Sequence, residues 1–150
     1  MVSRFPDTLT YTLSGHTGNV TAVRFNTNAN YFCSVSTDKT LKQWNVIKGK
    51  LIYTFTGGHL AEILDATLFV SFIHNIYCYS MFSNAFYSLF SSDHANSLIA
   101  TCGADKLVVV WDISTAKART RFRGHTQVCW KLYCQTLIPL FIQININLTK

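Results

Sequence analysis

Residues 97–113, SLIATCGADKLVVVWDI, contain the most informative pattern in this chain, and residues 30–46, NYFCSVSTDKTLKQWNV, repeat it. When the two are aligned on Asp105 and Asp38, each has a hydroxyl residue four positions earlier, a lysine directly after and a tryptophan six positions later. Each stretch predicts an apolar strand, a tight turn at the aspartate and a second strand. A pattern that recurs within one chain indicates a repeat architecture.

A Gly-His pair recurs at residues 15–16, 58–59 and 124–125, each time after a short alternating run. The first two pairs are 43 residues apart, a spacing typical of a four-stranded propeller blade that opens with Gly-His and closes with Trp-Asp. The sequence therefore resembles the WD-repeat family of β-propellers. The resemblance implies an all-β fragment of about two four-stranded blades with an incomplete ring, because closed rings have about 4 to 8 blades.

The second and third Gly-His pairs are 66 residues apart, so the second repeat carries about 23 residues more than the first repeat. These marks divide the chain into five segments. They are a disordered end at 1–8, the first repeat and the start of the second at 9–66, an apolar insert at 67–92, the rest of the second repeat and the start of a third at 93–127, and a tail without a WD pattern at 128–150.

Alternating or apolar runs bounded by turn residues predict the strands of each repeat. Residues 9–13 alternate, and we expect them to form the outer strand of a blade completed elsewhere in the ring. The other expected strands are 20–25, 31–35, 41–45 and 51–55 in the first repeat, and 62–66, 98–102, 107–112 and 118–122 in the second.

The insert contains no Asp, Glu, Lys or Arg, and three interpretations compete for it. A transmembrane helix would be long enough, but His, Asn and Ser residues interrupt it and it would divide one blade. A natural loop insertion of this length is seldom so apolar. We favour a translated intron for the insert and the tail, because both are rich in residues with A/T-rich codons and both interrupt or end a repeat in mid-strand. Val128 also has a codon that begins with GT, as an intron does.

The composition limits which binding partners and which cellular compartment can be expected. A formal net charge of +6 permits an acidic partner, but only 13% of residues are charged while 49% are hydrophobic. No apolar signal segment begins the chain, and the cysteines show no CxxC spacing. We therefore expect a cytoplasmic or nuclear protein with five free thiols, at Cys33, Cys78, Cys102, Cys129 and Cys134.

Two sets of side chains have the composition of a Ser-His-Asp catalytic site. The hydroxyl residues lie inside apolar strands, however, with a tryptophan to cover them and no glycine-rich nucleophile turn beside them. The family resemblance implies structural tetrads instead, in which Trp bonds to the hydroxyl, the hydroxyl to His and His to Asp. The tetrads are His16, Ser34, Asp38 and Trp44, and His59, Thr101, Asp105 and Trp111.

The sequence predicts no catalytic residue, no cofactor and no metal site, because it lacks a phosphate-binding loop, paired ligand histidines and a catalytic acidic pair. The candidates for partner binding are cationic. Lys39 and Lys106 lie at the predicted turns. Lys117, Arg119, Arg121 and Arg123 alternate along one predicted outer strand, so we expect them to share a face. They could bind phosphate or an acidic peptide, but we favour a charged edge that prevents pairing with other chains.

Several strings resemble one branch of the family, the WD-repeat scaffolds called mitogen-activated protein kinase organizers. They are AVRFN at 22–26, TDKTLKQWN at 37–45, EILDA at 62–66, DKLVVVWD at 105–112 and RFRGH at 121–125. The resemblance implies a seven-bladed, non-enzymatic scaffold for proteins of the kinase cascade, or alternatively a spliceosome-associated factor in mRNA processing. The expected partners are therefore proteins, without direct nucleic-acid binding and without a membrane.

Overall fold

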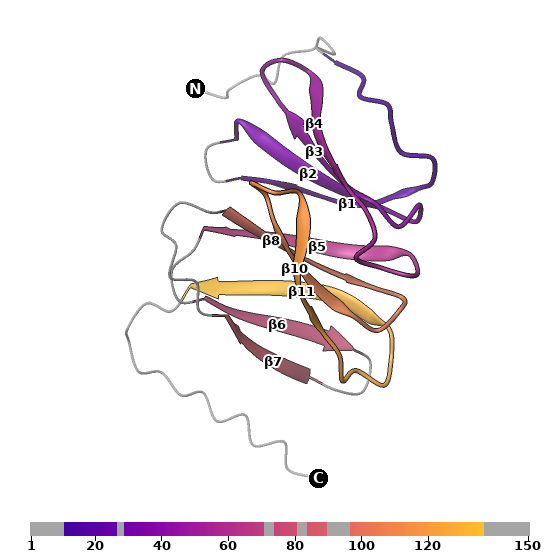
Figure 1. The fold of residues 1–150 in the computed structure, drawn as a ribbon, viewed down its shortest axis with the longest axis vertical. Coiled ribbons are helices and arrows are strands. Elements are labelled where there is room, and N and C mark those ends of the chain that lie inside the picture. Colours follow the sequence, from indigo (N-terminus) through magenta and orange to yellow (C-terminus); the bar gives the residue numbers. More distant parts are fainter. Residues whose placement is uncertain (1–10, 27–28, 71–73, 81–83, 90–96, 137–150) are drawn as a thin grey trace, which may run out of the picture.

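The computed structural model describes residues 11–26, 29–70, 74–80, 84–89 and 97–136, which form three antiparallel sheets without a helix (Figure 1). The first sheet has the order β1-β2-β3-β4 and takes all four strands from one continuous segment. Its strands are β1 Val20–Phe25, β2 Tyr31–Ser36, β3 Leu41–Asn45 and β4 Lys50–Phe55.

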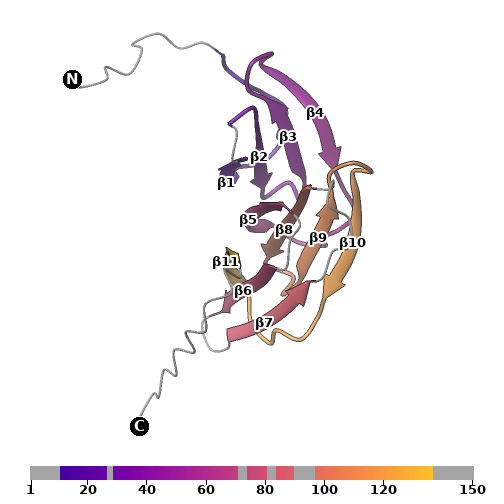
Figure 2. The same cartoon turned by 90° about the vertical axis from the view of Figure 1, so that its left-hand side faces the viewer.

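The second sheet, in the order β10-β9-β8-β5, takes its strands from both sides of the insert. They are β5 Ile63–Val70, β8 Ser97–Gly103, β9 Val108–Asp112 and β10 Lys117–Phe122. The three sheets follow one another along an open arc, in which β1, β5 and β11 lie on the concave side and β4 and β10 on the convex side (Figure 2). This arrangement confirms the predicted all-β propeller fragment with an incomplete ring.

Strands from the insert and the tail form a third sheet, in the order β11-β6-β7. They are β6 His74–Ser80, β7 Asn84–Leu89 and β11 Cys129–Thr136. The described parts of the insert are thus strands and not the helix that a membrane span would need, and no helix in the described residues is long and apolar enough to cross a membrane. The predicted boundary at residue 67 also falls inside β5, which continues to Val70.

The expected outer strand at residues 9–13 does not form in its described part, because residues 11–13 have no strand partner among the described residues. Tyr11 instead donates a hydrogen bond from its hydroxyl to the Ile47 carbonyl, at 3.2 Å. Its ring lies against Gly49, where a Cβ would come within 2.6 Å of the ring. A propeller strand needs a neighbouring strand to satisfy its backbone groups.

The buried side chains form two clusters, one between each pair of adjacent sheets. The cluster between the first and second sheets includes Val35, Leu41, Phe55, Ile99 and Trp111. The other cluster joins the second sheet to Cys129 and Leu132 of β11. Cys33, Cys102 and Cys129 are buried and form no disulfide, and burial raises the pKa of Cys33 to about 12. The side chains of Cys78 and Cys134 lie outside the described residues.

Candidate functional site

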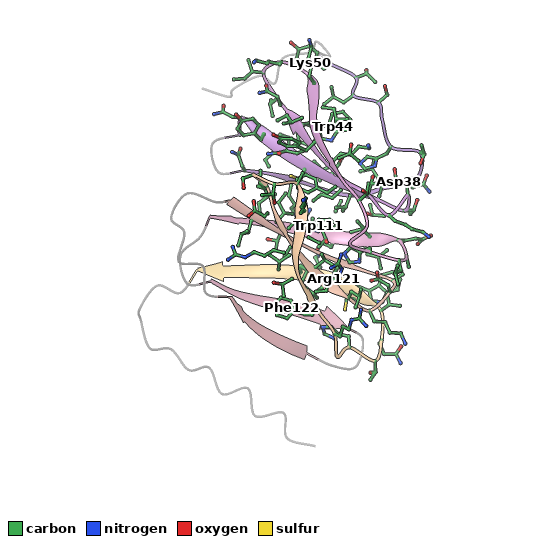
Figure 3. The ribbon with its side chains drawn as sticks, viewed as in Figure 1. Asp38, Trp44, Lys50, Trp111, Arg121 and Phe122 are labelled. Carbon is green, nitrogen blue, oxygen red and sulfur yellow. The ribbon has the colours of Figure 1, made fainter. Side chains whose placement is uncertain are left out.

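Hydrogen bonds join the four predicted side chains of the first repeat, of which Figure 3 labels Asp38 and Trp44. The Trp44 Nε1–H donates to Ser34 Oγ at 2.8 Å. Ser34 Oγ lies 2.8 Å from His16 Nε2, and His16 Nδ1 lies 2.9 Å from the Asp38 carboxylate. Because an indole can only donate, the consistent assignment is a serine hydroxyl that donates to Nε2 and an Nδ1–H that donates to Asp38.

The second repeat holds the same arrangement, although about twice as many residues separate its members. Trp111 Nε1 donates to Thr101 Oγ1 at 2.7 Å, and Thr101 Oγ1 lies 2.8 Å from His59 Nε2. His59 Nδ1 lies 3.0 Å from both carboxylate oxygens of Asp105. Gly58 makes room for the indole, since a Cβ at Gly58 would lie 2.2 Å from the Trp111 ring.

Burial and hydrogen bonding shift the pKa values of these groups. Burial lowers the pKa of His59 and outweighs the Asp105 carboxylate, which raises it. For Asp105, burial raises the pKa, but hydrogen bonds from His59 and from the Leu60 N–H outweigh it and hold the pKa below its usual value. Asp38 also has a lowered pKa, because bonds from Thr40, His16 and Thr17 overcome the effect of burial.

The order hydroxyl, imidazole, carboxylate is also that of a Ser-His-Asp triad, but the surroundings oppose catalysis. A nucleophile must be reachable by a substrate carbonyl and must lie beside donors for the oxyanion. Ser34 is 4% exposed and Thr101 is 0% exposed, and a tryptophan N–H bonds to each hydroxyl oxygen. The arrangement instead satisfies buried polar groups while it joins two strands, a turn and a loop.

The two turn lysines occupy equivalent, strained positions. Lys39 and Lys106 have φ values of 68° and 66°, in the left-handed region that non-glycine residues seldom adopt. The N–H of Lys39 bonds to Ser36 O at 3.2 Å and that of Lys106 to Gly103 O at 3.1 Å, which closes each turn. Both side chains are exposed, so both are available to a partner.

The prediction that the cations of this outer strand share one face is wrong within β10, because the register shifts between Ala118 and Thr120. Ala118 packs against the cluster toward the first sheet, whereas Phe122 packs against the cluster toward β11. This bulge places Lys117 on the face opposite to Arg121, and Arg123 lies beyond the end of β10. The Arg121 guanidinium bonds to the carbonyls of residues 57 and 58, at 3.0 and 3.3 Å.

Sequence reasoning missed a buried carboxylate that joins all three sheets. Asp65 of β5 is 3% exposed. It pairs with the Arg24 guanidinium of β1 and accepts the Leu132 N–H of β11, at 3.1 Å. The signal was an acidic residue in the otherwise apolar string ILDA, since a buried carboxylate requires partners. Within the described residues, no group of three His, Cys, Asp or Glu side chains could hold a metal ion.

The family model described as WD domain, G-beta repeat matches residues 7–45 and 73–112, more than half of the chain. The chain is 28% identical over 120 residues to the WD repeat domain-containing protein 83 homolog of Dictyostelium discoideum, covering 69% of this chain and 37% of that protein. It is 49% identical over 55 residues to WD repeat domain-containing protein 83 of Homo sapiens, covering 37% of this chain and 17% of that protein.

A solved structure titled "Structure of U3-55K" has a similar fold, with a TM-score of 0.54 and 18% sequence identity. The similarity covers 77% of this chain and 30% of that one. The chain therefore spans less than two fifths of the length of each of these proteins.

Proposed function

Because the chain belongs to the WD-repeat family, we propose that it acts as a non-enzymatic scaffold for protein interactions and that it gathers components of the mitogen-activated protein kinase cascade. The observation that supports the scaffold role is that the polar groups of the two tetrads are enclosed and bonded to one another. Their hydroxyl and imidazole groups are enclosed within the sheets and bonded to one another. What remains accessible is the set of turns and outer strands, where protein partners can bind.

The kinase-cascade role is supported by the five strings that resemble kinase organizers, among them EILDA and RFRGH. The similarity to proteins named WD repeat domain-containing protein 83 in two distant organisms is consistent with one branch of the family. We propose this role for the whole protein, because the binding surface of a propeller combines several blades.

Affinity purification of the tagged full chain from cells, followed by mass spectrometry, tests this role. We expect kinase-cascade proteins to be enriched with the wild-type chain and lost with Trp111→Ala, which removes the centre of the buried cluster between the first two sheets. Equal recovery of these proteins with the tag alone would contradict the role.

The alternative is a spliceosome-associated factor, which the net charge of +6 favours. The same purification with and without ribonuclease separates the two functions. Spliceosomal proteins that disappear after ribonuclease treatment would favour the alternative, whereas kinase-cascade proteins that resist the treatment would favour the first role.

A further inference from the structure

The third sheet has one strand fewer than the other two. The first and second sheets run from an inner strand, β1 or β5, to an outer fourth strand, β4 or β10 (Figure 2). The third sheet begins with β11 on the inner side and ends at β7. Within the described residues, the outer edge of β7 therefore has no neighbouring strand, and such an edge presents unpaired N–H and C=O groups.

Residues 9–13 have the sequence of an outer strand. Each outer strand comes shortly before a Gly-His pair: β4 precedes residues 58–59 and β10 precedes residues 124–125. Residues 9–13, LTYTL, precede the Gly-His pair at 15–16 in the same way, and they closely resemble residues 51–55 of β4, LIYTF. In the described part of this segment, residues 11–13 have no strand partner among the described residues. The chain thus has an outer strand that lacks a sheet and a sheet that lacks an outer strand.

The lengths of the connections limit which sheet this strand can join. Residues 56–62 lead from β4 to β5 of the next sheet, and residues 123–128 lead from β10 to β11. Residues 14–19 lead into β1 with a connection of similar length, and such a segment spans at most about 20 Å. A sheet that contains residues 9–13 must therefore lie beside the first sheet. The third sheet of the same chain lies at the other end of the arc, beyond the second sheet (Figure 2).

The first sheet also has an exposed apolar face on the side away from the second sheet. Phe25 of β1 and Leu51 of β4 are 58% and 43% exposed. They lie opposite Phe32 and Trp44, whose rings stack on the same face. Phe32 precedes Cys33, which belongs to the cluster toward the second sheet, so Phe32 and its neighbours point the other way. A further sheet beside this face would bury these apolar side chains, which favours association.

We propose that two copies of this chain exchange residues 9–13, so that this segment of each copy becomes the fourth strand of the partner's third sheet, antiparallel to β7. The partner's third sheet then covers the exposed apolar face of the first sheet. Strand addition of this kind gains backbone hydrogen bonds along the ladder. In return, the segment gives up one exposed hydrogen bond, from the Tyr11 hydroxyl to the Ile47 carbonyl.

The exchange is reciprocal, so each copy gives one strand and receives one. Identical chains that use the same pair of surfaces twice form a closed dimer with a two-fold axis. Two arcs of three sheets each then make a ring of about six blades, within the range of about 4 to 8 that closed rings have. This assembly is a property of the chain beyond the scaffold role and does not depend on it.

Sedimentation equilibrium of the full chain across a dilution series tests the proposal. We expect a mass of twice the 17.0 kDa of one chain, with reversible dissociation on dilution. Thr10→Pro together with Tyr11→Pro should weaken the dimer about hundredfold or more. Neighbouring residues of a strand direct their N–H groups to opposite sides, so one of the two prolines removes a donor from the ladder in either register.

Ser3→Pro together with Arg4→Pro is the matched control, because it places two prolines in the segment before the expected strand. It should change the dissociation constant less than about twofold. The described strands begin at Val20, so both double variants should retain the far-UV circular dichroism of the wild-type chain.

Amide hydrogen exchange locates the contact. Exchange of residues 84–89 of β7 should be about tenfold or more slower in the dimer than in the monomer, because a new ladder protects the amides on its outer edge. A monomer at every concentration would overturn the proposal, and so would a dimer that Thr10→Pro with Tyr11→Pro leaves unchanged. Protection of residues 23–25 without protection of β7 would mean that the copies pack face to face without exchanging a strand, which would also overturn it. Assemblies that grow beyond the dimer would contradict the closed ring.

Discussion

The first and second sheets have the same strand order and the same tetrad, but they are assembled from the chain in different ways. The first uses one continuous segment, residues 20–55, whereas residues 71–96 separate β5 from the other three strands of the second. Val70 and Ser97 nevertheless form the last pair of the β5–β8 ladder. The comparison shows that strand pairing and the tetrad define the blade, because an insertion at a strand end leaves both intact.

The two tetrads also differ in what covers them. Phe55 of the first sheet contacts the Trp111 ring edge-on, with centroids 5.8 Å apart, and Trp111 is 0% exposed. Trp44 is stacked on Phe32 of its own sheet and is 4% exposed. Both tetrads have the same Trp-to-hydroxyl, hydroxyl-to-His and His-to-Asp bonds, so their difference in burial comes from the neighbouring sheet that packs on the second tetrad.

The largest expected effect is a difference between the two tryptophans in how much each one stabilises the folded chain. Trp111→Ala should lower the free energy of unfolding by about 3–5 kcal/mol, because it empties a site between two sheets. Trp44→Ala should cost about 2 kcal/mol, because solvent can fill the space on the open side of the first sheet. Urea denaturation of both variants measures the difference. Equal losses would mean that hydrogen bonding, and not packing, dominates both tetrads.

A smaller loss of stability is expected when the close contact between Gly58 and Trp111 is disturbed. Gly58→Ala should cost about 1–3 kcal/mol, because its Cβ would overlap the indole and force the side chains apart. In a Trp111→Phe background the smaller ring leaves room, so the added cost of Gly58→Ala should fall. A double-mutant cycle measures this coupling. Additive costs would show that the alanine disturbs the loop and not the indole.

The pH dependence distinguishes the buried imidazole from the carboxylates. Because the pKa of His59 is lower in the folded chain than in the unfolded one, the unfolded state binds more protons, and stability should fall as the pH drops below about 6.5. The lowered pKa values of Asp38 and Asp105 should add a second loss below about pH 4.

His59→Gln should reduce the first of these two losses and retain the second, since glutamine does not titrate. Part of the first loss should remain, because burial also lowers the pKa of His125. Urea denaturation between pH 7 and pH 3 measures both. An unchanged first loss in His59→Gln would assign it to another group.

The smallest expected effect concerns the insert. Replacing residues 71–96 by Asn-Gly should keep the β5–β8 pairing, because Val70 and Ser97 already lie opposite each other and a two-residue turn can join them. Amide exchange of residues 99–102 should stay slow in this variant. Fast exchange there would show that the insert supports the second sheet.

We also propose that the insert and the tail are translated intron. Long-read sequencing of spliced transcripts tests this: messages without codons 67–92 that continue into further repeats after codon 127 would support it. A dominant message that contains both segments would contradict it.

Much of the fold could be predicted, because the same pattern occurs twice in the chain and each copy supports the interpretation of the other. The β3 limits at Leu41–Asn45 agree with the predicted strand, since a tight turn and a tryptophan mark its two ends. The bulge at Ala118 could not be predicted, because alternation in the sequence carries no information on where a register shifts. The pairing of β6 with β11 was also missed, since strands distant in sequence pair through tertiary contacts.

The sequence by itself determined that the same residue types recur at matching offsets in two repeats, because local spacing is read directly from the chain, and the family resemblance implied that these residues form each tetrad. Only the tertiary structure decided how deeply each tetrad is buried and that Asp65 joins Arg24 to Leu132 across three sheets. These properties depend on which sheet lies against which, and burial and long-range charge pairing exist only once the sheets have packed.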